Sequence, residues 1–163
     1  MLALKQWICD ACGEIIETPE DGYVVWKWLD KNTERAAVEG RFEYKILHKN
    51  YADEQGIHHG CDKDKSYTKS AALSVFLGVD GLVKLLSMID AGPMHMPVYR
   101  EQITNIRDFL EFFRRVQLPY YEEARSLWSI AYDDGFFDGV NEVWIYLPSS
   151  LKDLIKKYGP QCN

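Results

Sequence analysis

Three of the four cysteines and one histidine are spaced like the ligands of a structural metal site. Cys9 and Cys12 are separated by two residues, and His58 and Cys61 repeat that spacing further along the chain. Two thiolates on a tight turn can both reach one ion, and Gly13 can take the positive φ that such a turn often requires. Four protein ligands fill a tetrahedral site, so the pattern predicts one structural Zn²⁺ that stabilises the fold and does not activate water.

The fourth ligand has three candidates. His58 gives an HxxC pair with Cys61, whereas His48 directly follows the β-favouring segment 44–47, and a histidine at the end of a strand can lean over a cysteine turn. His59, next to His58, is the third. The predicted metal ligands are therefore Cys9, Cys12 and Cys61 with His58 or His48, and His59 as the remaining alternative.

The segment Cys9-Asp10-Ala11-Cys12-Gly13 resembles the CxxCG knuckle of zinc ribbons. The resemblance covers the first third of the chain. It implies a small β-hairpin module with a second knuckle, here His58 to Cys61, holding one structural zinc ion. The chain departs from an ordinary zinc ribbon in the length of sequence between its two knuckles.

A redox role for Cys9 and Cys12 is the main alternative chemistry. A thioredoxin-type CxxC lies at the start of a helix that follows a strand, within a βαβ unit. The residues after Cys12, with Gly13 followed by Thr18-Pro19, do not favour a long helix. Metal binding is the preferred interpretation, with small buried structural thiols as another. Cys162 stands apart near the C-terminal end.

The elements around these residues change type near residue 65. The segments 23–29 and 41–47 are rich in β-branched and aromatic residues and are predicted to be antiparallel strands, joined by a polar hairpin loop over 30–40. After Ser66 the apolar residues recur at helical spacing. We therefore predict an α+β fold, with a zinc-ribbon-like β module over 1–65 and a domain of four or five helices over 66–163.

The predicted helices are defined by apolar stripes and by Pro or Gly at their ends. The first two are separated by Gly78, the third begins at Pro97, the fourth follows Pro119, and the last is capped by Ser150. Segment 142–147 favours a short strand or an extended segment. The stripes expected to be buried are Leu73, Phe76 and Leu77; Leu82, Leu85, Leu86 and Ile89; Ile103, Ile106, Phe109, Leu110, Phe113 and Val116; Ala124, Leu127, Trp128 and Ala131; and Leu151, Leu154, Ile155 and Tyr158.

Bulk properties argue against several classes of partner. The net charge of −6 disfavours nonspecific binding to nucleic acid or to anionic membranes. No apolar stretch approaches the roughly 20 residues of a transmembrane helix, and the first residues lack the pattern of a secretory signal. The expected location is cytoplasmic.

Other candidate chemistry is weaker. Asp133, Asp134 and Asp138 miss the spacing of a calcium loop and are expected to form an acidic turn, and Met94-His95-Met96 is expected to be a connecting loop. None of the common hydrolase or nucleotide-binding motifs occurs, so we assign no catalytic and no cofactor-binding residues. The acidic pair Glu122 and Glu123 is expected at a solvent-exposed helix start.

These observations favour a non-enzymatic, zinc-stabilised protein-binding or adaptor protein. Its partner surface would be aromatic and helical, since Phe112 lies off the main stripe and other aromatic residues flank helix ends; these are Tyr120, Tyr121, Phe136 and Phe137. The alternative is a nucleic-acid-associated regulator that uses Arg100, Arg107, Arg114 and Arg115, which are expected on the outer face of the third helix. A small hydrolase with zinc in an open site is the third hypothesis.

Overall fold

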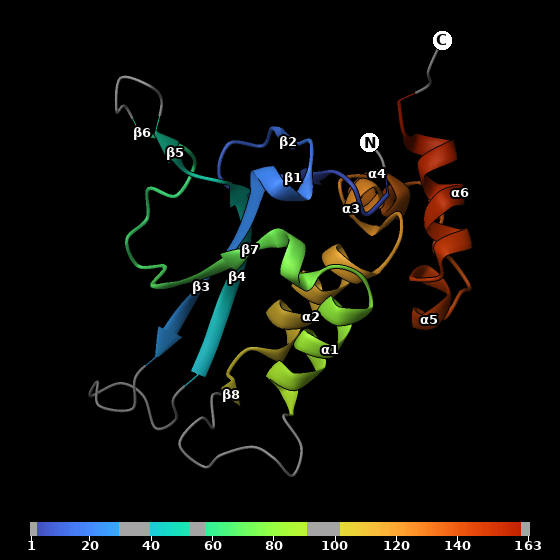
Figure 1. The fold of residues 1–163 in the computed structure, drawn as a ribbon. Helices are drawn as coiled ribbons and strands as arrows, with labels where there is room; N and C mark the ends of the chain where they lie inside the picture. The colour runs from blue at the N-terminus through green and yellow to red at the C-terminus, as the bar shows by residue number, and fades with distance from the viewer. Residues whose placement is uncertain (1–2, 30–39, 53–57, 91–101, 161–163) are drawn as a thin grey trace.

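The structure is a computed structural model that describes residues 3–29, 40–52, 58–90 and 102–160. Strands predominate in the first half of these residues and helices in the second (Figure 1). The predicted α+β class is confirmed. No helix in the described ranges has both the length and the apolar character that a membrane crossing requires.

The largest sheet of the described residues has four strands, in the order β7-β3-β4-β8. Its strands are β3 (Gly22–Leu29), β4 (Gly40–His48), β7 (Lys69–Ala72) and β8 (Gln102–Ile103). The predicted antiparallel pairing of the two long strands, β3 and β4, is confirmed, with Gly22 opposite His48 and an irregularity between Val25 and Lys27. Of the predicted hairpin loop over 30–40, residues 30–39 lie outside the described residues, and Gly40 is the first residue of β4.

The sheet includes strands from both sides of residue 65. β7 pairs with β3 in antiparallel fashion, and β8 lies parallel to β4. The division of the chain into modules of 1–65 and 66–163 stays a prediction. There are two further strand pairs. β1 (Trp7–Ile8) pairs with β2 (Ile15–Ile16), and these two strands flank the turn that contains Cys9 and Cys12. β5 (Tyr51–Ala52) pairs with β6 (His58–His59), which precedes Cys61.

The described residues contain six α-helices and two 3-10 helices. These are η1 (Pro19–Asp21), η2 (Leu73–Phe76), α1 (Gly78–Ile89), α2 (Ile106–Gln117), α3 (Tyr121–Arg125), α4 (Trp128–Asp133), α5 (Glu142–Ile145) and α6 (Pro148–Tyr158). The stripe predicted as one fourth helix is divided between α3 and α4. α6 begins at Pro148, before the predicted cap Ser150, and ends before Gly159 as predicted.

Two other boundaries correct the sequence prediction. α2 begins at Ile106, because the side chain of Asn105 accepts a hydrogen bond from the N–H of Asp108 and caps the helix. Ile103 therefore belongs to β8, and Pro97 lies outside the described residues. Segment 142–147, predicted to be a short strand or an extended segment, instead forms α5 over 142–145, which Asn141 caps by accepting a hydrogen bond from the N–H of Trp144.

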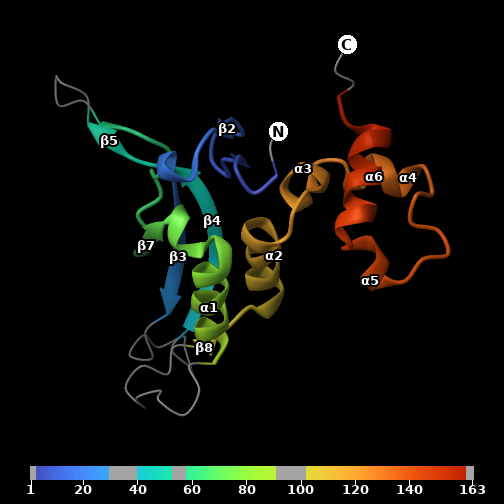
Figure 2. The same ribbon diagram turned by 45° about the vertical axis from the view of Figure 1, so that its right-hand side comes forward.

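The buried side chains form two clusters. The first joins the sheet to α1 and α2 and contains Phe112, whose ring stacks on Tyr44 with 5.1 Å between the ring centroids. The prediction that Phe112 lies off the buried face is wrong. The second cluster joins α3, α4 and α6, and Phe136 and Phe137 pack against it. Figure 2 shows α4, α5 and α6 set apart from the sheet, beyond α2 and α3.

The outer face of α1 differs from the prediction. Leu85 is buried as expected, but Leu82, Leu86 and Ile89 are exposed. The reason is the contact of α1 with η2: a Cβ atom at Gly81 would lie 2.1 Å from the carbonyl carbon of Phe76. Because only glycine allows this approach, the face containing Gly81 and Leu85 turns inward and the rest of the apolar stripe faces outward.

Candidate metal centre

The first cysteine pair lies on a tight turn between β1 and β2. The N–H of Cys9 donates to the carbonyl of Glu14, and the N–H of Gly13 donates to the carbonyl of Cys9, both at 2.9 Å. Gly13 has φ +77°, which is the conformation predicted for it. This turn leads into a short strand rather than a helix, unlike the CxxC of a thioredoxin-type redox site.

Asp10 fixes this turn against the end of β4. Its N–H donates to the carbonyl of Ile46 at 2.9 Å, and its Oδ2 accepts a hydrogen bond from the N–H of Ile46 at 2.7 Å. His48 follows two residues later and is the last residue of β4. The paired backbone therefore brings the His48 side chain next to the cysteines.

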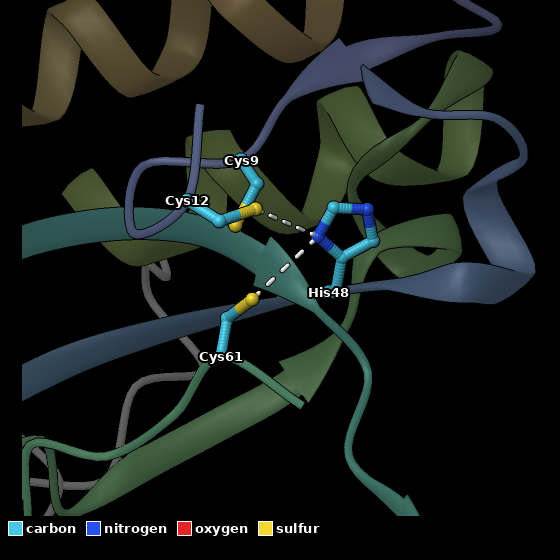
Figure 3. A group of neighbouring side chains, drawn as sticks. All are labelled: Cys9, Cys12, His48 and Cys61. Atoms are coloured by element: carbon cyan, nitrogen blue, oxygen red, sulfur yellow. Dashed lines mark hydrogen bonds between the residues drawn. The ribbon is translucent and has the colours of Figure 1, made fainter. Parts of the chain in front are cut away.

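Four ligand atoms converge at this point (Figure 3). One atom each from Cys9, Cys12, His48 and Cys61 lies within 4.8 Å of all the others. The Nδ1 atom of His48 is 3.5 Å from the sulfur of Cys12 and 3.7 Å from that of Cys61. With zinc bond lengths of about 2.3 Å to sulfur and about 2.0–2.1 Å to nitrogen, a tetrahedral site has ligand–ligand distances of roughly 3.5–3.8 Å. This Cys₃His group could hold a metal ion.

The imidazole of His48 is oriented by its second nitrogen. Nε2 lies 3.2 Å from the carbonyl oxygen of Ile15, and since a carbonyl only accepts, Nε2 carries the proton and donates. Nδ1 then presents a lone pair toward the sulfur atoms. Histidine ligands of metals commonly show this arrangement, in which an outer hydrogen bond fixes the tautomer and the ring orientation.

The thiols differ in their environments. Burial alone would raise the pKa of Cys9, but backbone hydrogen bonds from Cys12, Ala11 and His48 outweigh it and lower the pKa to about 7. Burial, together with the neighbouring thiols of Cys12 and Cys9, raises the pKa of Cys61 to about 12. The thiol of Cys9 therefore loses its proton more readily than the thiol of Cys61.

The structure brings together four of the predicted site residues, namely Cys9, Cys12, Cys61 and His48. The backbones of His58 and His59 form β6, and their side chains lie outside the described part of the chain. Met94-His95-Met96 and Cys162 also lie outside it. In the predicted acidic turn, Asp134 binds Lys157 and the hydroxyl of Tyr158 rather than joining a described metal-binding group.

A buried ion pair beside the cysteine turn was missed by the sequence prediction. Arg115 and Glu122, both expected at solvent-exposed positions, are 3% and 2% exposed. Arg115 binds Glu122 at 2.7 and 2.8 Å and Asp10 at 2.6 Å. The N–H of Ile8 donates to Glu122, and the carbonyl of Ile8 accepts from Arg115. Arg115 of α2 and Glu122 of α3 therefore hold the residues on both sides of Cys9. This ion-pair network joins three separate segments of the chain, so no local sequence pattern predicts it.

No protein-family model, no curated protein and no solved structure matches this chain. The geometry of the Cys₃His group is therefore the basis for assigning its chemistry.

Proposed function

We propose that this chain is a zinc protein in which one Zn²⁺, bound by Cys9, Cys12, Cys61 and His48, has a structural role. The convergence of the four ligand atoms, at the spacing of a tetrahedral site, is the observation that supports this most. Three thiolates and an imidazole are a typical ligand set for zinc. Four protein ligands leave no position for a reactive water, so the site would stabilise the fold.

The biological role that fits a closed metal site best is protein binding without catalysis. The zinc would hold the cysteine turn and β4 together, while the molecule presents an exposed apolar helix, α1, to solvent. The nucleic-acid alternative has less support. Of its arginines, Arg115 is buried in an ion pair and Arg114 lies over the ring of Tyr146 at 4.2 Å, and the net charge is −6.

The test of the metal assignment is elemental analysis of the purified chain. We expect one zinc ion per chain. Replacement by Co²⁺ should give the visible absorption of a tetrahedral ion with thiolate charge-transfer bands. Absence of a stoichiometric metal would overturn the proposal, and a five- or six-coordinate cobalt spectrum would overturn the closed, structural site.

The assignment of the histidine ligand can be tested with two matched variants. His48→Ala should weaken zinc binding by more than about 100-fold, since even outer residues of metal sites commonly contribute 10–100-fold. His58→Ala, which removes the same side chain from β6, should retain one zinc with near wild-type affinity. Competition with a chromophoric chelator measures both affinities. The reverse pattern would transfer the fourth ligand position to His58.

Zinc affinity should increase with pH. The pKa of Cys61 is raised to about 12, so its thiol is protonated in the metal-free chain at neutral pH and must lose that proton on binding. At least one proton released gives at least about a tenfold gain in affinity per pH unit between pH 6 and pH 8. Chelator competition at pH 6, 7 and 8 measures the slope. An affinity independent of pH would exclude Cys61 as a thiolate ligand.

A further inference from the structure

The exposed face of α1 has the residue spacing of a helix-pairing surface. Val79, Leu82, Leu86 and Ile89 follow one another at intervals of three, four and three residues, which is the a/d spacing of paired helices. Their side chains are 78%, 36%, 51% and 51% exposed, and the adjacent Val83 is 61% exposed. We call these five residues the α1 seam.

The α1 seam carries no charge. Lys84 turns away from it, with its ammonium 5.5 Å from the ring centroid of Phe76 on the inner side of the helix. Asp80 and Ser87 are three and four residues from Val83 and so border the seam on its polar side. The same surface can therefore face a copy of itself without placing like charges together, which is the requirement for an interface with two-fold symmetry.

Helix α2 extends this surface. Gln117 donates to the carbonyls of Phe76, the last residue of η2, and of Gly78, the first residue of α1. Ile106 and Leu110 lie on the same face of α2 as Gln117, at helical spacing, and are 53% and 37% exposed. Both ribbon views show the two helices side by side (Figures 1 and 2).

The apolar area is close to what a small dimer interface buries. At on the order of 100 Å² of apolar surface for a fully exposed Val, Leu or Ile, the seam exposes roughly 300 Å², and Ile106 and Leu110 bring this to roughly 350–400 Å². A standard interface buries about 800 Å² per partner, of which roughly 60% is apolar. This surface thus supplies most of the apolar part of such an interface.

We infer that the chain forms a reversible homodimer through antiparallel pairing of two α1 helices. A two-fold axis beside the middle of the helix places Leu82 of one copy against Leu86 of the other, and Val79 against Ile89. The proposed function includes protein binding, and this inference rests on that proposal and names a second copy of the chain as the partner. It does not depend on which metal the Cys₃His group holds. The modest area gives a dissociation constant of roughly 1–100 μM.

Sedimentation velocity on the full chain, from about 1 to about 300 μM, measures this association. We expect a monomer that converts to a dimer as concentration rises. Leu86→Asp should weaken dimerisation by at least about 100-fold, because symmetry places the unpaired carboxylate in the interface twice. Lys84→Asp places a carboxylate on the same helix away from the seam and should leave the dimer intact. Val79→Asp, at the most exposed seam position, is a second disruptive variant if Leu86→Asp reduces folding.

The antiparallel register has its own test. Leu82→Lys and Leu86→Asp should each be monomeric alone, whereas an equimolar mixture should form a heterodimer, because antiparallel pairing places the lysine opposite the aspartate. Failure of the mixture to associate would overturn this register. A wild-type chain that stays monomeric at the highest concentration, or a dimer that survives Leu86→Asp, would overturn the inference. Metal content, measured on the same samples, shows separately whether the zinc proposal holds.

Discussion

Removal of zinc should lower the melting temperature of this chain by about 10 °C or more. A ligand that binds only the folded state stabilises it by about 4 kcal/mol when present at 1,000 times its dissociation constant, and about 1 kcal/mol shifts a chain of this size by roughly 2–4 °C. The cysteine turn is also part of the main core through Trp7, Cys9 and Ile16. The loss should therefore reach the sheet, and not remain confined to the turn. Differential scanning calorimetry with and without a chelator measures the shift.

Cysteine variants separate loss of metal from a direct effect of the chelator. Cys12→Ser removes an exposed sulfur that contributes little to the core, so its destabilisation should come mainly from lost metal binding. Cys162→Ser is the matched control, since it removes a thiol that the proposed site does not use. We expect the first variant to melt like the chelated protein and to be insensitive to chelator, and the second to melt like the wild type. If Cys12→Ser and the wild type have the same melting temperature in the presence of zinc, the proposal that zinc stabilises the fold is wrong.

The part of the candidate metal site that could be predicted from the sequence is the part that depends on the spacing of neighbouring residues. Cys9, Cys12 and Gly13 specify a turn by themselves, and the alternation along β4 identifies it as a strand. The choice between His48 and His58 depends on register, because Asp10 pairs with Ile46 and so places His48 at the turn. A pairing between distant backbone atoms has no signature in the histidine positions alone.

The differences between the predicted and the observed secondary structure have similar causes. Segment 142–145 has β-favouring residues, yet a cap from Asn141 and packing of Trp144 on Phe136, with 5.8 Å between ring centroids, accompany a helix there. The apolar stripe of α1 is wide enough to be buried on either side. Its orientation is decided by the approach of Gly81 to Phe76, which depends on tertiary packing.

Arg115 should be among the most sensitive residues outside the metal site. Burial alone would lower its pKa, but hydrogen bonds and opposite charges from Glu122 and Asp10 raise it, so the guanidinium stays charged. It connects α2 with α3 through Glu122, and it holds Asp10 and Ile8 on either side of Cys9. Through these contacts the helical half positions the cysteine turn, which links folding of the C-terminal helices to metal binding.

Arg115→Met should therefore destabilise the chain by about 3–5 kcal/mol, because the buried Glu122 carboxylate loses its closest cation, at 2.7 Å, and keeps only Arg125, at 3.5 Å. Zinc affinity should fall as well, by about 10–100-fold, as for other residues that orient metal ligands. Arg107→Met, an exposed arginine on the same helix, is the matched control and should change stability by less than about 0.5 kcal/mol. The double variant Arg115→Met/Glu122→Gln also removes the buried carboxylate charge and should recover part of the loss in urea unfolding. If the single and double variants unfold alike, the charge of the Glu122 carboxylate is not the cause. If zinc affinity is unchanged, the turn does not depend on Arg115.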